Sequence, residues 1–142
     1  MSLLTEHETR TLDELCMKLF ENPNVTFAGI INNKGKLVAG GFRKEFTPYD
    51  ADKLSMLFLE LYLDYSMRRE FDSILGKINS ITSRRQRVNV TTIPFNDDLI
   101  LILSEPNTDI ENLVETSYKI FNYYFQTISE NMFIGTNTVN KL

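Results

Sequence analysis

Few residues in this sequence could carry catalytic chemistry, and their positions do not favour it. His7 is the only histidine and Cys16 the only cysteine among 142 residues. His7 falls in the first turn of an expected N-terminal helix. Cys16 falls in the apolar stripe of that helix, where a cysteine is more often a small core side chain than a nucleophile. One His and one Cys cannot complete a zinc site of the usual ligands. We therefore expect a protein that is not an enzyme, with no metal and no cofactor.

Acidic and glycine motifs also indicate turns in preference to binding sites. Asp97 and Asp98 follow Asn96, and such clusters are typical of a hairpin turn. The glycines at 35, 40 and 41 lack the G-x-G-x-x-G and G-K-[ST] spacings that hold phosphate groups. These acidic and glycine residues therefore predict turns of the backbone and not a phosphate-binding or metal-binding site.

Composition limits the classes of partner. The net charge of -4 argues against general nucleic-acid binding, which needs an extended basic face. No run approaches the ~20 apolar residues of a membrane helix, and no secretory leader is evident. We therefore expect a cytoplasmic protein that binds neither nucleic acid nor membrane.

The strongest charge feature is a group of three arginines, Arg84, Arg85 and Arg87. Guanidinium groups at this density could bind phosphate, a nucleotide or an acidic protein surface. Alternatively, they protect an edge strand from pairing with other molecules, because charged side chains discourage aggregation between sheets. Both interpretations stay open, and contact with an acidic partner is the functional one.

The first half of the chain predicts a helix, a hairpin and a long helix. Thr5 and Glu8 have the spacing of a capping box, which begins the first helix. Two β-prone runs, 25–31 and 36–42, surround an Asn/Gly turn and predict a hairpin. Thr47-Pro48 then predicts the start of a middle helix that ends near Ser66 or as late as Leu75.

The second half predicts two or three strands and a last helix. Residues 77–86 allow no assignment, residues 87–95 alternate as in a strand, and the apolar run 99–103 is typical of a central strand covered on both faces. Thr108 and Glu111 form a second capping-box pattern before the last helix.

This order predicts an α+β fold, α-β-β-α-β-β(-β)-α, with an antiparallel sheet flanked by helices. We expect a single domain over residues 1–130 and a flexible C-terminal tail over 131–142, whose composition is too polar for strong packing.

The middle helix has two apolar faces. At about 100° per residue, one face collects Leu54, Leu57, Phe58, Leu61 and Tyr65. The opposite face collects Met56, Leu59, Leu63 and Met67. The second face must be covered either by another helix of the chain or by a partner, most simply a second copy. We predict a homodimer with these four residues at its interface.

The hairpin segment FAGIINNKGKLVAG, residues 27–40, resembles the opening strands of roadblock/LC7 (dynein light chain type) domains. The order of elements over residues 5–128 is also similar to that family, although the segment 66–86 is longer than its pattern. The resemblance implies a noncatalytic domain that dimerises through its middle helix and an edge strand. It further implies a scaffold in signalling or a regulator of small GTPases.

A second hypothesis is a small-molecule sensor of the PAS or GAF kind, because those domains have similar strands and helices. A sensor needs a cavity between sheet and helices, lined by aromatic side chains and a few polar groups. The aromatic residues of the middle and last helices are the candidates for such a lining.

Overall fold

The helices and strands follow the predicted order. The computed structural model describes residues 5–44 and 49–132, with side chains up to Asn122, in two units, Met1–Thr108 and Asp109–Leu142. The elements in chain order are α1 (Glu6–Leu19), β1 (Val25–Ile31), β2 (Leu37–Phe42), α2 (Ala51–Arg68), η1 (Arg69–Phe71), α3 (Asp72–Leu75), β3 (Ile81–Arg84), β4 (Asn89–Phe95), β5 (Asp98–Ser104) and α4 (Ile110–Met132). The predicted α+β class is therefore confirmed.

The five strands form one antiparallel sheet in the order β2-β1-β5-β4-β3. The central strand is β5, as its continuous apolar run predicted, and its residues 99–103 are buried. The unassigned stretch 77–86 contains β3, a strand of four residues at one edge of the sheet. Pro94 is tolerated in β4 because β3 pairs only with residues 89–92, so no neighbour on that side needs the missing N–H.

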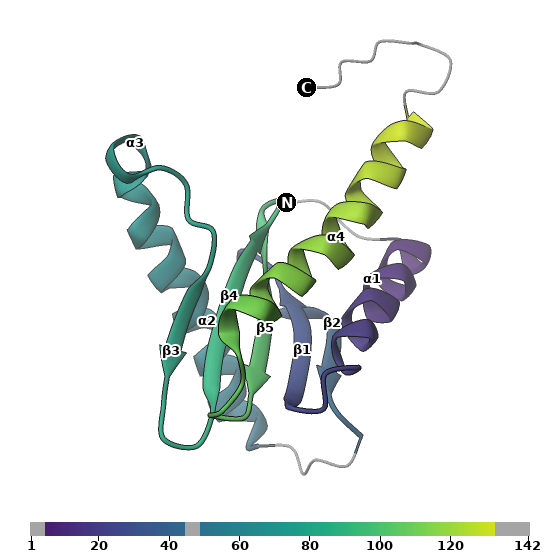
Figure 1. The fold of residues 1–142 in the computed structure, drawn as a ribbon. Coiled ribbons are helices and arrows are strands. Elements are labelled where there is room, and N and C mark those ends of the chain that lie inside the picture. Colours follow the sequence, from purple (N-terminus) through teal and green to yellow (C-terminus); the bar gives the residue numbers. More distant parts are fainter. Residues whose placement is uncertain (1–4, 45–48, 133–142) are drawn as a thin grey trace. The chain divides into compact units, whose positions relative to one another are not determined.

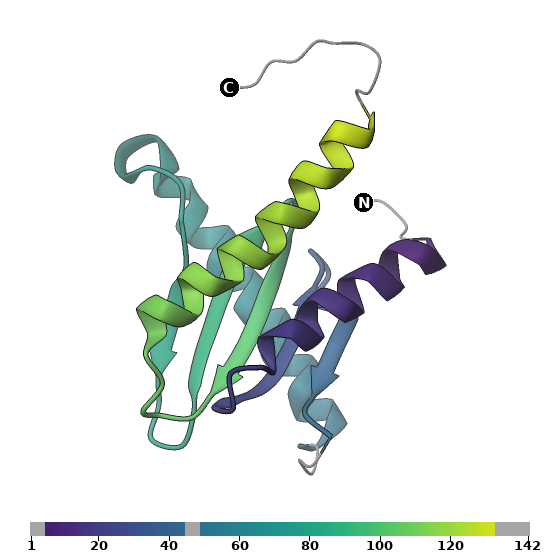
Figure 2. The ribbon, with the colours of Figure 1, turned by 45° about the vertical axis from the view of Figure 1, so that its right-hand side comes forward.

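Helices α1 and α2 cover opposite faces of the sheet (Figures 1 and 2). Helix α1 begins with the predicted capping box, in which the Thr5 hydroxyl accepts the Glu8 N–H and the Glu8 carboxylate accepts the Thr5 N–H. It buries the predicted stripe of Leu12, Leu15, Cys16 and Leu19.

Helix α2 covers the other face with aromatic side chains. Its buried residues Phe58, Tyr62 and Tyr65 pack in one cluster with strand residues that include Phe27 and Leu101. The rings of Tyr62 and Tyr65 meet edge to face, with centroids 5.6 Å apart. Phe58 and Tyr65 of the predicted face are buried and Leu54 and Leu61 pack against the cluster, but Tyr62, which that face did not include, is buried with them.

Two predicted helix starts are wrong, because a neighbouring aspartate caps the helix instead. We expected α2 to begin at Thr47 and Pro48, which lie outside the described residues. Helix α2 instead begins at Ala51, and the Asp50 carboxylate accepts the Asp52 N–H at 2.8 Å.

Before α4, too, an aspartate caps the helix in place of the predicted threonine. The capping box predicted for Thr108 and Glu111 is replaced by Asp109, whose carboxylate accepts the Asn112 N–H at 3.1 Å. The Thr108 hydroxyl donates to the Glu105 carbonyl at 2.6 Å and is not a cap. Asp and Thr are both strong N-cap residues, so local propensity alone does not choose between adjacent candidates.

The fourth strand is shorter than predicted. We expected a strand from Arg87, but β4 begins at Asn89, and Arg87 lies in the turn closed by the hydrogen bond from Arg85 N–H to Val88 O. The buried Asn89 amide donates to the carbonyls of Glu105 and Pro106, which holds this end of β4 beside the end of β5. Of the predicted tail, residues 133–142 lie outside the described residues, and α4 runs to Met132.

The β1–β2 turn contacts α2 closely at Gly35. The Asn32 carboxamide oxygen accepts the N–H groups of Lys34 and Lys36, and Gly35 has φ of +72°. A Cβ atom at Gly35 would lie 2.6 Å from the Leu59 Cα. Only glycine therefore combines this φ with this distance from the helix.

We predict that Gly35→Ala lowers the free energy of unfolding by at least about 2 kcal/mol. Alanine is strained at this positive φ, and its Cβ atom would also overlap the α2 backbone at Leu59. Gly76 has φ of 87° and ψ of 170°, a conformation essentially restricted to glycine, but no steric neighbour, so Gly76→Ala should cost about 1–3 kcal/mol. Gly41→Ala meets no atom within 4 Å and should change stability by less than about 0.5 kcal/mol. Urea denaturation followed by circular dichroism measures all three, and equal losses for Gly35→Ala and Gly41→Ala would contradict the packing argument.

Candidate interaction surface

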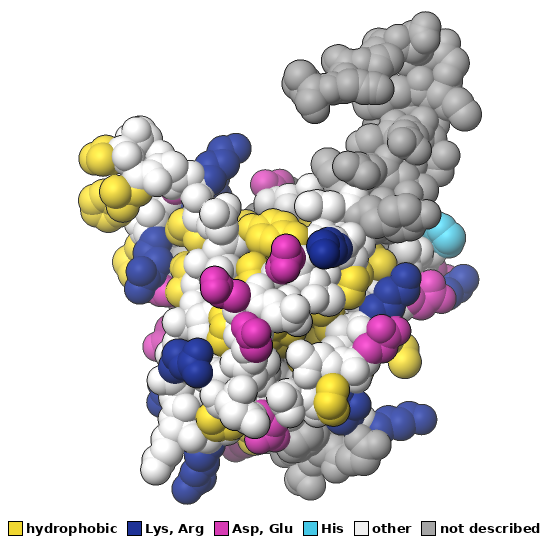
Figure 3. Space-filling model, viewed as in Figure 1, with side chains coloured by type: hydrophobic (Ala, Val, Ile, Leu, Met, Phe, Trp, Pro, Cys, Tyr) yellow, Lys and Arg dark blue, Asp and Glu magenta, His cyan; other side chains and the backbone are white. Residues whose placement is uncertain are grey.

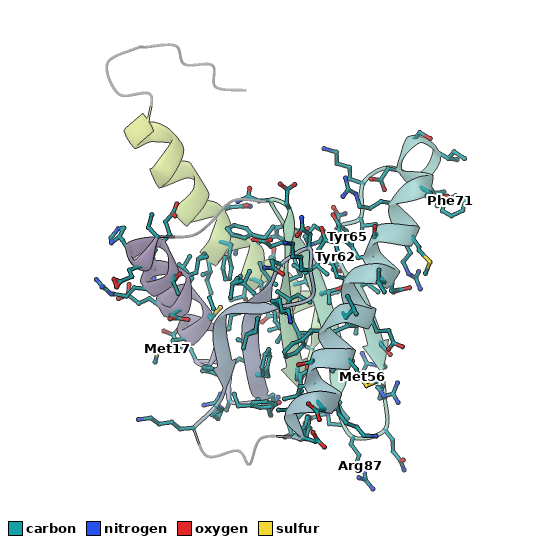
Figure 4. All side chains as sticks on the ribbon, turned by 180° about the vertical axis from the view of Figure 1, so that it is seen from behind. Met17, Met56, Tyr62, Tyr65, Phe71 and Arg87 are labelled. Carbon is teal, nitrogen blue, oxygen red and sulfur yellow. The ribbon has the colours of Figure 1, made fainter. Side chains whose placement is uncertain are left out.

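Among the residues that the structure describes, the outer face of α2 is a largely exposed apolar surface, which the β1–β2 turn meets only at Leu59. Met56, Leu59, Leu63 and Met67 are exposed, with 70%, 45%, 53% and 65% of their surfaces accessible. In Figure 4, Met56 and Phe71 lie along α2 and η1 while Tyr62 and Tyr65 lie on the side toward the sheet. The structure therefore places the four predicted interface residues together on one helix face, and we call this set the α2 outer face.

Charged groups border the α2 outer face toward its C-terminal end. Arg68 forms an ion pair with Asp64 at 3.1 Å, and both side chains are substantially solvated. The Arg69 guanidinium lies over the Tyr65 ring, 5.5 Å from its centroid. Such exposed ion pairs contribute little to stability, so these residues shape the border of the face more than they stabilise the fold.

The two edges of the sheet differ in regularity. At β2, the Asp13 carboxylate of α1 accepts the N–H of Gly40 at 2.7 Å, and Gly40 has φ of +82°. At the opposite edge, β3 pairs with β4 without a register shift over Ile81–Arg84. A bound N–H and an irregular backbone both hinder the addition of another strand, so β3 is the edge better suited to strand pairing.

The three arginines lie together at one end of β3. Arg84 ends the strand and donates to the Pro106 carbonyl at 3.2 Å, while Arg85 and Arg87 lie in the connection to β4. All three side chains are exposed. The structure therefore groups the predicted basic residues in one turn, labelled at Arg87 in Figure 4, next to an edge strand.

Of the residues considered for catalysis, His7 is exposed in the first turn of α1, whereas Cys16 lies on the buried side of the same helix. Cys16 is fully buried, and burial, followed by the charge of Asp13, raises the pKa of its thiol to about 12. A thiol with this pKa is protonated at neutral pH and is a poor nucleophile. Among the side chains that the structure describes, over residues 5–44 and 49–122, no group of three or more His, Cys, Asp or Glu is arranged to hold a metal ion.

The acidic pair is part of a turn, as predicted. Asn96, with φ of 57°, and Asp97 connect β4 to β5, and Asp98 is the first residue of β5. Burial, and then the charge of Asp97, raise the pKa of the Asp98 carboxyl. The Asp97 carbonyl accepts the Tyr62 hydroxyl at 2.8 Å, which ties this turn to α2.

The buried aromatic side chains of α2 pack against the sheet. Phe58, Tyr62 and Tyr65 pack against the aliphatic face of the sheet, and the Tyr62 hydroxyl is occupied by its bond to the turn. These three residues are therefore part of the hydrophobic core.

In the part of the chain that the structure describes, no helix is both long enough and apolar enough to span a membrane.

Comparisons with known proteins identify a family and a fold. The family described as "Family of unknown function (DUF6659)" matches residues 4–134. None of the curated proteins compared with this sequence matches it.

Three solved structures show the relationship of the fold. The Roadblock/LC7 domain from Streptomyces avermitilis has a TM-score of 0.65 at 14% identity, covering 83% of this chain and 98% of that one. MglB with a tetrameric arrangement has a TM-score of 0.66 at 11% identity, covering 85% and 95%. Schizosaccharomyces pombe profilin has a TM-score of 0.58 at 9% identity, covering 82% and 98%. The predicted roadblock/LC7-like, profilin-like fold is therefore confirmed.

The contact between Asp13 and the β2 edge yields a prediction. Asp13→Ala should remove about 1 kcal/mol of stability with the lost hydrogen bond, and it should increase association through the freed edge. Glu14→Ala removes the same charge from an exposed neighbouring position and should do neither. Light scattering and urea denaturation of both variants test this, and indistinguishable behaviour of the two would contradict a role for the Asp13 bond.

Proposed function

This chain belongs to DUF6659, a family of unknown function, and from its fold and surface we propose that it is a noncatalytic homodimeric scaffold or regulatory protein. The observation that carries the proposal is the α2 outer face, with four large apolar side chains exposed on one helix. Contiguous exposed apolar surface is typical of protein–protein contacts. A second copy of the chain is the simplest partner, because a two-fold axis brings the same face of each copy together.

The edge strand β3 supplies the second part of the proposed interface. The resemblance to roadblock/LC7 domains implies dimerisation through the middle helix and an edge strand together. Of the two edges, β3 is regular, whereas Gly40 on β2 is bound by Asp13. We therefore assign the strand contact to β3, where pairing would continue the sheet from one copy into the other.

The arginine turn is the proposed contact for a further, acidic protein partner. Arg84, Arg85 and Arg87 are exposed beside β3, and several guanidinium groups in one turn suit an acidic surface. The family resemblance implies regulation of small GTPases, so a small GTPase in a cytoplasmic signalling assembly is the class of partner proposed. Such a role needs no catalytic residue from this chain.

We predict that the protein is a dimer at micromolar concentration, with about twice the chain mass of 16.5 kDa by light scattering. Leu63→Glu should raise the dimer dissociation constant at least ~100-fold, since the lost burial occurs in both copies. Its circular dichroism should be unchanged, because the side chain is exposed within the chain. Met17→Glu, at an exposed methionine of α1, is the control and should stay dimeric. A monomeric wild-type protein would refute the proposed dimer.

We predict that replacing Arg84, Arg85 and Arg87 with Gln lowers the salt concentration at which the protein elutes from a polyglutamate column. The matched control replaces Arg10, Lys18 and Lys34, three exposed basic residues on other elements. Because both triple variants lose three positive charges, only a local arginine site separates them. Equal elution of the two variants would show that net charge alone determines retention.

A further inference from the structure

The apolar surface does not end with α2 but continues over the segment that follows it. Phe71 of η1 is 54% exposed, and Ile74 and Leu75 of α3 are 77% and 78% exposed. Figure 4 shows Phe71 on the side away from Tyr62 and Tyr65, and Figure 3 shows hydrophobic side chains gathered where α3 lies in Figure 1. We call Arg69–Leu75 the arm; it belongs to the segment that is longer than the roadblock/LC7 pattern.

An arm of this composition needs a partner surface. Helix α3 has four residues, and so short a helix is not stable from its own hydrogen bonds. Single exposed apolar residues are common, whereas adjacent ones on a projecting segment indicate a contact. The arm is continuous with the α2 outer face, so in the proposed dimer the surface nearest to the arm belongs to the partner subunit.

The intervals between the residues of the α2 outer face are nearly the same whether they are counted from the N-terminal or from the C-terminal end of the helix. Met56, Leu59, Leu63 and Met67 are separated by three, four and four positions. An antiparallel pair of α2 helices therefore places Met56 opposite Met67 of the partner subunit and Leu59 beside Leu63. This is the self-complementarity that a two-fold interface requires, in which residue i meets j and j meets i.

The dipoles of the two α2 helices select the same orientation, because antiparallel helices bring each positive N-terminal end beside a negative C-terminal end. The side-chain charges are mixed at both ends, with Asp50, Asp52 and Lys53 at the N-terminal end and Arg68, Arg69, Glu70 and Asp72 at or beyond the C-terminal end. These side-chain charges therefore do not choose between the two orientations.

The same register places the arm opposite the N-terminal end of the partner's α2. Continued outward, the pairing that sets Met56 opposite Met67 sets Ile74 opposite Tyr49 of the partner subunit. Tyr49 is 54% exposed, and its ring meets that of Phe42 edge to face, with centroids 5.5 Å apart. An aromatic ring held in this way is a preformed apolar surface for an aliphatic side chain.

We propose that the arm of each copy crosses to the other copy and packs against Tyr49 at the start of the partner's α2. This inference rests on the proposed homodimer and deepens it, because it assigns the antiparallel register and a second contact area. Two such contacts, related by the two-fold axis, lie at the ends of the paired α2 helices. The dimer would then be held by the paired α2 helices and by two reciprocal arm contacts, one from each copy.

Disulfide trapping tests the register. In the double variant Tyr49→Cys/Ile74→Cys, mild oxidation should produce a covalent dimer on a denaturing, non-reducing gel. A bond within one chain is excluded, because the two positions are roughly 35 Å apart along the helical segment and a disulfide needs Cα atoms within ~7 Å. Each single variant should stay uncrosslinked, and Cys16 should not react because it is buried.

The outcomes separate this inference from the proposed dimer. A covalent dimer in either single variant would indicate that like ends meet and would overturn the antiparallel register. A double variant that light scattering shows to be dimeric, yet that forms no disulfide, would overturn the arm contact and leave the proposed homodimer standing. A monomeric wild-type protein would overturn both.

A second measurement tests the contribution of the arm without cysteines. Ile74→Asp and Leu75→Asp should each raise the dimer dissociation constant at least tenfold in sedimentation equilibrium. Met17→Asp is the matched control, since Met17 is 66% exposed on α1, and it should leave the constant unchanged. Unchanged affinity in both arm variants would overturn the inference. The arm side chains are exposed within one chain, so their replacement should leave the circular dichroism spectrum of the folded protein unchanged.

Discussion

The structure depends on the burial of one strand from both sides. Residues 99–103 of β5 are apolar without alternation, and each is at most 2% exposed. A strand of this kind is stable only when other elements cover both faces of its sheet. Helices α1 and α2 lie on opposite faces of the sheet, and this requirement explains why two helices of such different character occur in one small fold.

The second apolar face of α2 is a consequence of this arrangement. Phe58, Tyr62 and Tyr65 already cover the sheet, so Met56 and Met67 face away from it. A monomer derives no stability from apolar side chains on the solvent side of a helix. Their presence is more readily explained by a contact that the isolated chain does not contain, which is the physical basis of the proposed homodimer.

The correct and incorrect helix caps show where local reasoning is sufficient. At Thr5, one capping residue lies before one helix, and the predicted bonds with Glu8 form. Before α2 and α4, threonine and aspartate compete within a few positions, and the aspartates Asp50 and Asp109 cap. Capping preferences differ by tenths of a kcal/mol between these residue types, so the path of the incoming chain decides between them.

The sequence by itself determined the order of elements, the central strand, the hairpin and both faces of α2, because each follows from a periodicity or turn within a few residues. It also identified the four residues of the α2 outer face and the three arginines. Only the tertiary structure decided that β3 is an edge strand and that Asp13 occupies the opposite edge. Those features depend on which distant segments meet, and short-range patterns carry no information about such long-range contacts.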